Sequence, residues 1–425
     1  MLPPEPKEPK GWLPWSALTA FGLAAVIAMA ALLPHSPLVD EHFHLAQIQH
    51  LIGGNFSMLP HLPMPPGYHA LIAAPASLLG VDSLFALRWI STAFSLTTVV
   101  LAGLILVRQR AGLPQLGTAQ ILFCPLMWPF YFLLYTDLVS TALVLSAVLL
   151  TTTGRYFSSA LFATVSLAVR QTSIVWTGLY WLLAVHRGGH AGRLQCLLTD
   201  RQPGWTRESA RILKAIVADI WPLLLPGVAF IAFVLWNGGI AVGSRDLHQL
   251  TSIYPTQIFM WLLVVWILTL PLQIARLRDI GRLIKTRPWI LLLPLFMLAI
   301  YWWCFAVTHH HNFGAPEFHL RNRLLLWMDQ SSIVRLAAFI PMAWAGLTLI
   351  VIKLRSPVHY WLFPLTVIAL LPVELIEQRY YIVPFVLWML FRRTEQPVTE
   401  WLLLSWFCLL SAALSWAIIS GRFFL

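Results

Sequence analysis

Charged side chains are scarce in this sequence. Lys, Arg, Asp and Glu together make up 11% of the 425 residues, while 59% are hydrophobic and the mean hydropathy is +0.74. A soluble globule of this size needs far more polar surface than that. The strict polar/apolar alternation of a membrane barrel strand is also missing. These absences leave an all-α integral membrane protein as the expected fold class.

Cysteine is rare as well. Cys124, Cys196, Cys304 and Cys408 are scattered and form no CxxC pair, so neither a zinc site nor a disulfide framework is indicated. The 21 tryptophans suit two interfacial belts. The net charge of +11 comes from Lys and Arg clustered in short loops between apolar runs, a pattern of membrane topology. We therefore expect membrane lipid, and no nucleic acid, among the partners.

Apolar stretches of roughly twenty residues, long enough to cross a bilayer, recur from end to end. We expect a single polytopic domain, residues 1–425, with about 12–13 transmembrane helices. The first is expected to be an anchor rather than a removed signal peptide, and the short pairs 156–169/172–186 and 358–373/379–391 to be broken or tilted helices. The expected spans are 13–33, 84–107, 115–134, 137–153, 156–169, 172–186, 215–237, 256–275, 288–308, 333–352, 358–373, 379–391 and 399–419.

The loops between these spans alternate in their Lys and Arg content, as the positive-inside rule requires. The basic loops, which are then cytoplasmic, contain Lys7 and Lys10, Arg108 and Arg110, Arg155, residues 187–214, residues 276–287, Lys353 and Arg355, and Arg392 and Arg393. The opposite, trans side receives residues 34–83, 135–137, 170–171, 238–255, 309–332 and 374–378. Because the acidic and histidine-rich motifs all lie there, we expect one shared polar site on the trans side. Within 34–83, Tyr68 to Leu79 is too short to cross and is expected to be an interfacial or re-entrant helix.

The first trans-side motif is Asp40-Glu41-His42-Phe43-His44, directly after the first span. Its carboxylates have three interpretations. They are a solvated helix cap with Asp40 at the N-cap, or a general base whose partial burial suits it to accept a hydroxyl proton. The third is a metal site from Asp40, His42 and His44, completed by His35 or one of His309, His310 and His311.

Five motifs in order along residues 36–385 resemble the alpha-1,2-glucosyltransferase family that adds the terminal glucose to the dolichol-linked oligosaccharide. They are Val39 to Gln47 with Gly53-Gly54-Asn55-Phe56 and Pro65-Pro66-Gly67-Tyr68; Phe132 to Asp137 with Ser140; Arg170 to Trp176; Trp236 to Gly243; and Glu377 to Pro384. One segment, His319 to Leu325, departs from the family pattern and keeps only its Asn-Arg pair, Asn322 and Arg323.

The resemblance implies a multi-spanning glycosyltransferase of the GT-C class and an inverting hexose transfer, of glucose by the family match, from a polyisoprenyl-phosphate sugar to a lipid-linked saccharide in alpha-1,2 linkage. It also implies substrate-binding roles for His44, Tyr68, Tyr135, Asp137, Gln171, Trp236 and Asn237 of the matched segments, and for Asn322 of the retained Asn-Arg pair. Because the donor already carries an activated leaving group, we expect no cofactor and no metal.

Such a reaction leaves the protein two tasks, to deprotonate the attacking hydroxyl and to stabilise the charge that develops on the departing phosphate. Asp40 is the expected general base, with Glu41 as the alternative base or as its positioning partner. An arginine fork is expected on the phosphate, and the candidates are Arg170, Arg379, Arg323 and Arg245. A purely structural reading pairs Arg170 with Asp137 and Arg379 with Glu374.

Several features have simpler interpretations. Trp236-Asn237-Gly238-Gly239 alone predicts a turn, the His309 to His311 run an interfacial segment, and Arg88 a side chain that reaches the trans headgroups. A transporter or flippase of a lipid-linked saccharide would also need trans-side acids and broken helices, although no internal repeat is visible. A structural subunit and an enzyme for another sugar are the remaining alternatives. We expect a multi-pass protein of the endoplasmic reticulum membrane or of a bacterial inner membrane, with its site on the lumenal or periplasmic side.

Overall fold

The computed structural model describes residue 5 and residues 15–190, 205–245 and 252–424. These residues form helices and no strand, apart from two isolated bridges, His319 with Phe424 and Leu354 with Arg392. The helices are α1 (Trp15–Leu32), α2 (Glu41–Ile52), α3 (Gly67–Leu79), α4 (Leu84–Arg108), α5 (Pro114–Leu122), α6 (Thr136–Thr153), α7 (Tyr156–Val169), α8 (Ile174–Arg187), α10 (Trp205–Ile220), α11 (Leu225–Asn237), α12 (Thr256–Leu268), α13 (Leu270–Ala275), α14 (Leu277–Thr286), α15 (Leu292–Cys304), α16 (Leu320–Gln330), α17 (Ser332–Val351), α18 (Leu362–Leu370), α19 (Ile382–Phe391) and α20 (Pro397–Ile419).

Within the described residues, every predicted span coincides with one or two helices, several of them joined to a short 3-10 turn. By length and hydropathy, five described helices can cross a membrane: Leu84–Arg108, Thr136–Thr153, Ala210–Asn237, Ser332–Val351 and Pro397–Ile419. A sixth candidate is the pair α14 and Pro288–Cys304, which is bent by 111°. The other predicted spans are shorter apolar helices or are interrupted. The protein is therefore a multi-pass membrane protein, and five or six of its described helical segments are long and apolar enough to cross a membrane.

Prolines account for several of the interruptions. The 3-10 turns Trp128–Tyr131, Pro288–Leu291 and Pro357–Trp361 each contain a proline in their first two positions. Proline lacks the N–H that a helix interior needs and clashes with the preceding turn, so the chain bends there. Hydropathy alone does not detect such breaks, so it predicts the apolar segments but not the positions at which they are interrupted.

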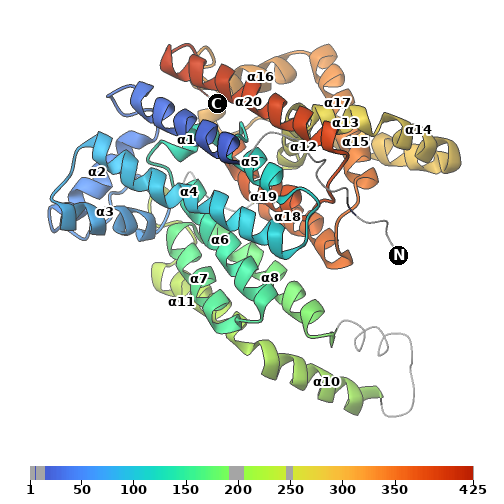
Figure 1. Ribbon diagram of the computed structural model, residues 1–425, viewed down its shortest axis with the longest axis horizontal. Helices are drawn as coiled ribbons and strands as arrows, with labels where there is room; N and C mark the ends of the chain where they lie inside the picture. Colours follow the sequence, from blue (N-terminus) through green and yellow to red (C-terminus); the bar gives the residue numbers. More distant parts are fainter. Residues whose placement is uncertain (1–4, 6–14, 191–204, 246–251, 425) are drawn as a thin grey trace.

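The first trans-side segment contains two short helices. α3, Gly67–Leu79, confirms the helix predicted between Tyr68 and Leu79, and α2, Glu41–Ile52, precedes it. The two helices pack against each other, at the left of Figure 1, and are followed by α4. Their contact buries Ile48, Tyr68 and Ile72 completely, so this segment is a packed part of the fold rather than a plain loop.

Helices α4, α6, α7 and α8 pack side by side in the middle of the molecule (Figure 1). Small and hydroxylated residues lie between them: Ser91, Ser95 and Thr98 of α4 are fully buried. The Thr98 hydroxyl donates to the Leu138 carbonyl at 3.0 Å. Small residues allow membrane helices to approach closely where the hydrophobic effect gives no driving force between them.

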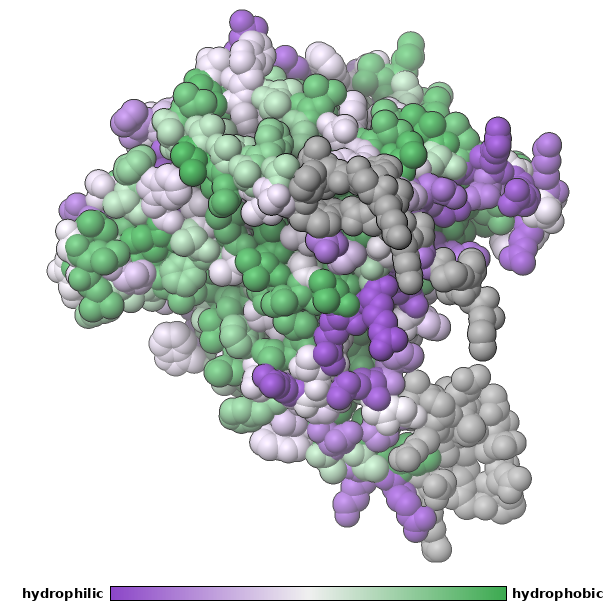
Figure 2. Space-filling model, viewed as in Figure 1, coloured by the Kyte–Doolittle hydropathy of each residue, from purple (hydrophilic) through white to green (hydrophobic). Residues whose placement is uncertain are grey.

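The outward faces of the helices expose large apolar side chains to the surroundings. Examples are Phe21 of α1, Phe157 of α7, Leu235 of α11, Phe296 of α15 and Ile340 of α17, each more than half exposed. Figure 2 shows apolar side chains over much of one face, whereas hydrophilic ones gather over α14 and toward α10. An apolar exterior of this kind fits a lipid environment.

The basic loops predicted to be cytoplasmic lie close together. The side chains of Arg108 and Arg187 both donate to the Thr152 carbonyl, at 3.4 and 3.1 Å. The Arg355 amide bonds the Phe391 carbonyl, and the Arg355 guanidinium pairs with Glu5 at 2.9 Å. Lys7, Lys10 and residues 191–204 of the predicted basic loops lie outside the described residues.

Candidate active site

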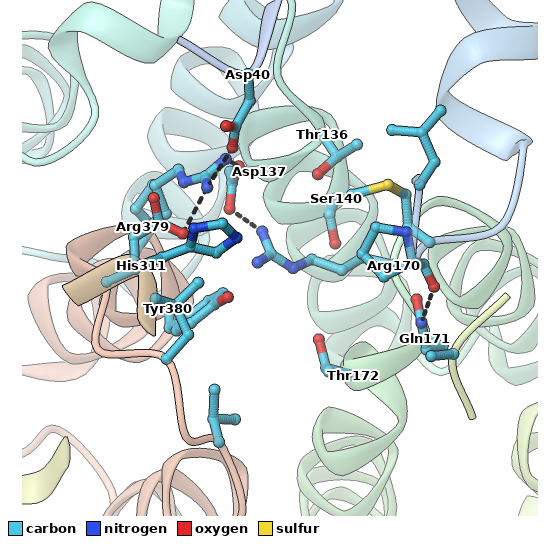
Figure 3. Close-up of a pocket in the computed structure, with 18 of the residues that line it drawn as sticks. Asp40, Thr136, Asp137, Ser140, Arg170, Gln171, Thr172, His311, Arg379 and Tyr380 are labelled. Carbon is cyan, nitrogen blue, oxygen red and sulfur yellow. Dashed lines mark hydrogen bonds and ion pairs between the residues drawn. The ribbon is translucent and has the colours of Figure 1, made fainter. Parts of the chain in front are cut away.

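A cavity of about 770 Å³ opens where the ends of many helices meet. All six segments predicted on the trans side contribute to its lining, although they come from distant parts of the sequence. The polar lining side chains discussed below are Asp40, His44, Asp137, Arg170, Gln171, Arg321, Glu377 and Arg379. Figure 3 shows several of them pointing toward one another across the cavity. The expected shared polar site is therefore present.

Asp40 occupies the N-cap position of α2, but its side chain makes no capping hydrogen bond. Its Oδ2 instead accepts from Nη2 of Arg379 at 2.7 Å, and its backbone N–H donates to the Tyr135 hydroxyl at 3.2 Å. The preceding Val39 has φ of +50°, a conformation that β-branched residues rarely adopt. The Asp40 side chain, 37% exposed, thus faces the cavity and an arginine rather than open water.

Arg379 lies in the 3-10 turn Gln378–Tyr381, directly before α19, and contacts three carboxylates. Besides Asp40, its Nη2 bonds Oε2 of Glu377 at 2.5 Å, and its Nη1 lies 3.8 Å from Oδ2 of Asp137. Its guanidinium also lies over the Tyr135 ring, 4.8 Å from the centroid. Its Nη2 is therefore committed to two carboxylates of the protein, and these partners are Asp40 and Glu377 rather than the expected Glu374.

Arg170 lies where α7 ends and projects into the same cavity. It pairs with Asp137, as the structural interpretation expected, and its guanidinium lies over the Tyr380 ring at 5.1 Å from the centroid. Its side chain is 20% exposed. With one carboxylate partner and a cavity-facing surface, Arg170 has more donor capacity left for a ligand than Arg379 has.

Glu377 and Arg321 complete this network, and sequence reasoning did not single them out as site residues. The Glu377 side chain is buried, with 4% of the residue exposed. Its Oε2 pairs with Arg379, and its Oε1 pairs with Nη1 of Arg321 at 3.0 Å. Burial alone would raise the pKa of Glu377, but the charges of Arg379 and Arg321 outweigh it, so this pKa lies below its ordinary value. The sequence feature that could have identified Glu377 as a site residue is its position two residues before Arg379 in a matched motif.

Glu41 does not line the cavity, although it directly follows Asp40. It is fully buried, and Arg88 of α4 binds it through Nε at 2.9 Å and Nη2 at 2.5 Å. The backbone N–H groups of Leu38 and Leu134 donate to the same carboxylate, at 2.8 and 2.9 Å. With its oxygens saturated, Glu41 has no accessible lone pair for a substrate proton. Arg88 is thus the buried partner of Glu41, not a side chain that reaches the headgroups.

Among the predicted substrate-binding residues, His44, Asp137 and Gln171 line the cavity. Burial, followed by the charges of Arg379 and Arg170, lowers the pKa of His44 to about 3, so this imidazole is neutral at physiological pH. Its Nδ1 lies 3.0 Å from Nε2 of His69. A neutral His44 can serve as a hydrogen-bond partner but not as a cation for a phosphate.

Tyr68, Tyr135 and Asn322 lie behind the lining rather than in it. The Tyr68 hydroxyl bonds Ser91 at 3.0 Å, and Tyr135 contacts Asp40 and Arg379 as described above. The Asn322 amide donates to the carbonyls of His311 and Gly314, at 2.8 and 2.7 Å. These residues support the lining segments and do not reach the cavity themselves.

Three other predicted residues, Arg323, Arg245 and Trp236, lie outside the cavity. Arg323 donates to the carbonyls of Pro316 and Glu317. Arg245, which is exposed, bonds Asn237 through both its backbone and side-chain oxygens. The Trp236 side chain is 85% exposed. Neither arginine is therefore placed to bind a phosphate in this cavity.

Asn237 builds the predicted turn. Its side-chain amide donates to the carbonyls of Gly239 and Ala241, both at 2.8 Å, and Gly238 has φ of +70°. The loop that follows pairs with the first trans-side segment: backbone N–H groups of Val242, Gly243 and Ser244 donate to the carbonyls of Pro63, Leu62 and Pro60, at 2.9 to 3.0 Å. Gln171 adds bonds to the carbonyls of Pro63 and Ile240. We call residues 60–64 with 240–244 the loop wall, because both line the cavity.

The metal interpretation finds no counterpart in the part of the chain that the structure describes, because no group of three or more His, Cys, Asp or Glu side chains there is placed to hold a metal ion. The Asp40 carboxylate contacts Arg379, and His44 contacts His69. The arrangement is instead a carboxylate held by one arginine, next to a second arginine that faces the same space.

Comparison with known proteins places these features in a family. The sequence profile of the DIE2/ALG10 family matches residues 34–390. The chain is similar to the Dol-P-Glc:Glc(2)Man(9)GlcNAc(2)-PP-Dol alpha-1,2-glucosyltransferase of Arabidopsis thaliana, at 28% identity over 88% of this chain and 90% of that protein. It is also similar to enzymes of the same name from Mus musculus and Homo sapiens, each at 26% identity over 83% of both chains.

Among solved structures, ArnT from Cupriavidus metallidurans in the apo state matches with a TM-score of 0.34 at 13% identity, covering 96% of this chain and 76% of that one. The family match spans all the segments that line the cavity. The chain belongs to the DIE2/ALG10 family.

Proposed function

We propose that this protein transfers glucose from a polyisoprenyl-phosphate glucose to a lipid-linked oligosaccharide, in alpha-1,2 linkage and with inversion at the sugar carbon, and that Asp40 is the general base. The observation that carries the proposal is the cavity in which Asp40, paired with Arg379, faces the same space as Arg170. Family membership supports the reaction type, and the relatives' names give the donor and the acceptor.

The cavity has an apolar side that suits the polyisoprenyl chain. From the level of Arg170 and Arg379, α8 and α19 run toward the predicted cytoplasmic face and line the cavity with Trp176, Ile382 and Val383. α18 ends at the same level and adds Leu370. A lipid tail lying there would keep its phosphate at the level of the arginines.

Arg170 is the better candidate for the donor phosphate. Arg379 is engaged by Asp40 and Glu377, whereas Arg170 has Asp137 as its carboxylate partner. A guanidinium fork offers paired donors to phosphate oxygens. Arg170 would hold the phosphate and stabilise the negative charge that grows on it, while Arg379 would orient Asp40.

The reaction step follows from these positions. The acceptor hydroxyl oxygen attacks the anomeric carbon of the donor glucose as its proton passes to Asp40. The bond from that carbon to the phosphate oxygen breaks, and the electron pair leaves with the polyisoprenyl phosphate. Protonation removes the negative charge of Asp40. Arg379 still keeps a charged partner at that stage, because it remains paired with Glu377. A positioned base of this kind contributes about 10²- to 10⁴-fold in rate.

Glu41 fits the positioning role. Its bonds to Arg88 and to the amides of Leu38 and Leu134 fix the start of α2 against α4 and α6. The adjacent Asp40 thereby receives a defined orientation. We place the site on the trans side of the membrane, the lumen of the endoplasmic reticulum or a bacterial periplasm, because its lining comes from the loops that lack basic clusters.

A transfer assay tests the proposal. The full chain is purified, reconstituted in lipid vesicles and given radiolabelled dolichyl-phosphate glucose with Glc(2)Man(9)GlcNAc(2)-PP-Dol, the acceptor in the relatives' names. We expect one labelled glucose on the acceptor, released by an alpha-1,2-specific glucosidase. Movement of the labelled lipid between leaflets without a new glycosidic bond would support a flippase and overturn the proposal, and so would label in a different linkage.

A further inference from the structure

The cavity has a second side, opposite in character to the apolar one. It is lined by trans-side segments, the start of α2, the loop wall and residues 311–321, and among its lining residues are Phe43, His61, Ser244, Gly314 and Ala315. His61, Ser244 and Arg321 supply polar groups to this side. A polar ligand that approaches from water therefore fits this side better than the apolar side.

Phe43 stands out on this side. It follows Asp40 by three positions, which places both side chains on the same face of the first turn of α2. The Phe43 side chain is 45% exposed although it borders a cavity. Nothing in the proposed chemistry of Asp40, Arg379 and Arg170 uses this ring.

His61 pairs with Phe43. The two ring centroids lie 5.7 Å apart, with the planes tilted by 53°, and the His61 side chain is exposed. Its backbone is fixed by the loop wall, because Ser244 donates to the Pro60 carbonyl through its N–H and to the His61 carbonyl through its hydroxyl, at 3.0 and 3.2 Å. The ring pair is thus presented by rigid backbone on both sides.

We infer that Phe43 and His61 form a subsite for the non-reducing end of the acceptor saccharide. The inference rests on the proposed function and deepens it. Each pyranose ring has apolar C–H faces and a polar rim, so it can lie against an aromatic ring while its hydroxyls bond polar groups. Here the aromatic face is one helical turn from Asp40, and the His61 imidazole and Ser244 hydroxyl supply polar partners. An acceptor sugar on Phe43 would have a hydroxyl within reach of the base, on the side of the cavity away from the donor lipid.

Steady-state kinetics with separate variation of the two substrates tests the subsite. In Phe43→Ala we expect the KM for Glc(2)Man(9)GlcNAc(2)-PP-Dol to rise about tenfold, equivalent to about 1.4 kcal/mol, with the KM for dolichyl-phosphate glucose unchanged. Phe43→Trp keeps an aromatic face and should keep the acceptor KM within about twofold. Phe56→Ala is the matched control, because Phe56 is 82% exposed in the same trans-side segment and does not line the cavity.

Three results would overturn the inference: an unchanged acceptor KM in Phe43→Ala, an equal rise in Phe56→Ala, or a rise confined to the donor KM, which would assign Phe43 to lipid. A binding measurement separates this inference from the proposed function. Saturation-transfer NMR of the released Glc(2)Man(9)GlcNAc(2) oligosaccharide with the full chain in nanodiscs should show contact at the terminal glucose that Phe43→Ala weakens. If the NMR contact were present but the protein had no transferase activity, only the proposed function would be contradicted. If the enzyme were active but showed no such contact, only the subsite would be contradicted.

Discussion

Asp40 and Arg379 are 339 positions apart in the sequence, yet the Asp40 Oδ2 accepts a hydrogen bond from Arg379 Nη2 at 2.7 Å. The bond joins the first trans-side segment to the segment before α19. Because the Asp40 N–H is also bonded to the Tyr135 hydroxyl, the carboxylate is oriented from its backbone and from its side chain. A base with a fixed orientation is what proton abstraction from a bound hydroxyl requires.

Replacing Asp40 with Asn should remove the base and keep the fold. Asn retains the shape of the side chain and an oxygen that can accept from Arg379, but it cannot take a proton from the acceptor hydroxyl. We expect kcat to fall by about 10²- to 10⁴-fold, measured by transfer of radiolabelled glucose. The KM for dolichyl-phosphate glucose should remain within about threefold of the original, because the phosphate is proposed to bind Arg170.

The matched control for this experiment is Asp82→Asn. Asp82 is an exposed carboxylate next to the same trans-side helices, and its backbone carbonyl, not its carboxylate, accepts the bond from Gln49. This variant should transfer glucose at the original rate. Near-normal turnover in Asp40→Asn would remove Asp40 from the role of general base.

Arg170 should be the arginine on which donor use depends most. Arg170→Met deletes the charged fork while keeping a long side chain, and the loss of a hydrogen bond to a charged group is worth about 1.5–3 kcal/mol. We therefore expect kcat/KM for the donor to fall roughly 10- to 150-fold. The same assay applied to Arg245→Met, which removes an exposed guanidinium outside the cavity, should show little change. A larger loss of donor kcat/KM in Arg245→Met than in Arg170→Met would mean that Arg245, not Arg170, binds the donor phosphate.

Much of this arrangement was predictable from the sequence. Hydropathy located the apolar helices but not the more polar α2, α14 and α16. The alternation of basic loops correctly assigned to one side of the membrane the segments that line the cavity. Asp40, Asp137, Arg170, Gln171 and Arg379 were all named by motif and all line one space. These predictions succeed because membrane insertion is governed by properties that are local in the sequence, namely apolar length and loop charge.

The partner of each charged side chain was harder to predict. Asp40 and Glu41 are adjacent in sequence, but consecutive side chains on a helix project about 100° apart. Asp40 rather than Glu41 faces the cavity because Arg88 of α4 forms a buried ion pair with Glu41. Likewise Arg379 pairs with Glu377 rather than Glu374 because the 3-10 turn Gln378–Tyr381 sets its direction. Such contacts are tertiary and leave no periodic signal.

Glu377 should matter for stability in acid. Because the pKa of Glu377 in the folded protein lies below its ordinary value of 4.5, its charged form stabilises the fold at pH values above about 4.5. This contribution is lost as the pH falls through the lower, folded-state pKa. We expect the thermal midpoint of the original protein to fall more steeply on acidification below pH 4.5 than that of Glu377→Gln, in differential scanning fluorimetry of detergent-solubilised protein.

Glu377→Gln should also lower kcat at neutral pH, since Arg379 and Arg321 lose their shared charge partner. Glu317→Gln provides the comparison, because Glu317 is an exposed carboxylate in a neighbouring trans-side segment. Its acid profile should match that of the unmodified chain. Identical acid profiles for Glu377→Gln and the unmodified chain would mean that Glu377 does not hold its charge in the folded state.

The loop wall supplies a test that involves no charged residue. A Cβ built on Gly243 lies 2.8 Å from the Leu62 carbonyl oxygen and still closer to that of Pro60, and neither backbone atom can move without breaking the bonds between the two loops. Gly239 lies four residues earlier, and a Cβ there meets nothing within 4 Å. Comparing substitutions at Gly243 and Gly239 therefore separates the effect of the close contact between the two loops from a general effect of replacing glycine.

We expect Gly243→Ala to push residues 60–64 away from 240–244 and to lower kcat/KM for the acceptor by about tenfold or more, by analogy with the cost of a 1 Å misplacement. Gly239→Ala should keep both kcat/KM and the thermal midpoint. Because Gln171 bonds both loops through Pro63 and Ile240, Gln171→Leu should reproduce part of the Gly243→Ala effect. If Gly243→Ala and Gly239→Ala behaved alike, the loop wall would not be needed to shape the cavity, and the acceptor side would have to be built by other segments.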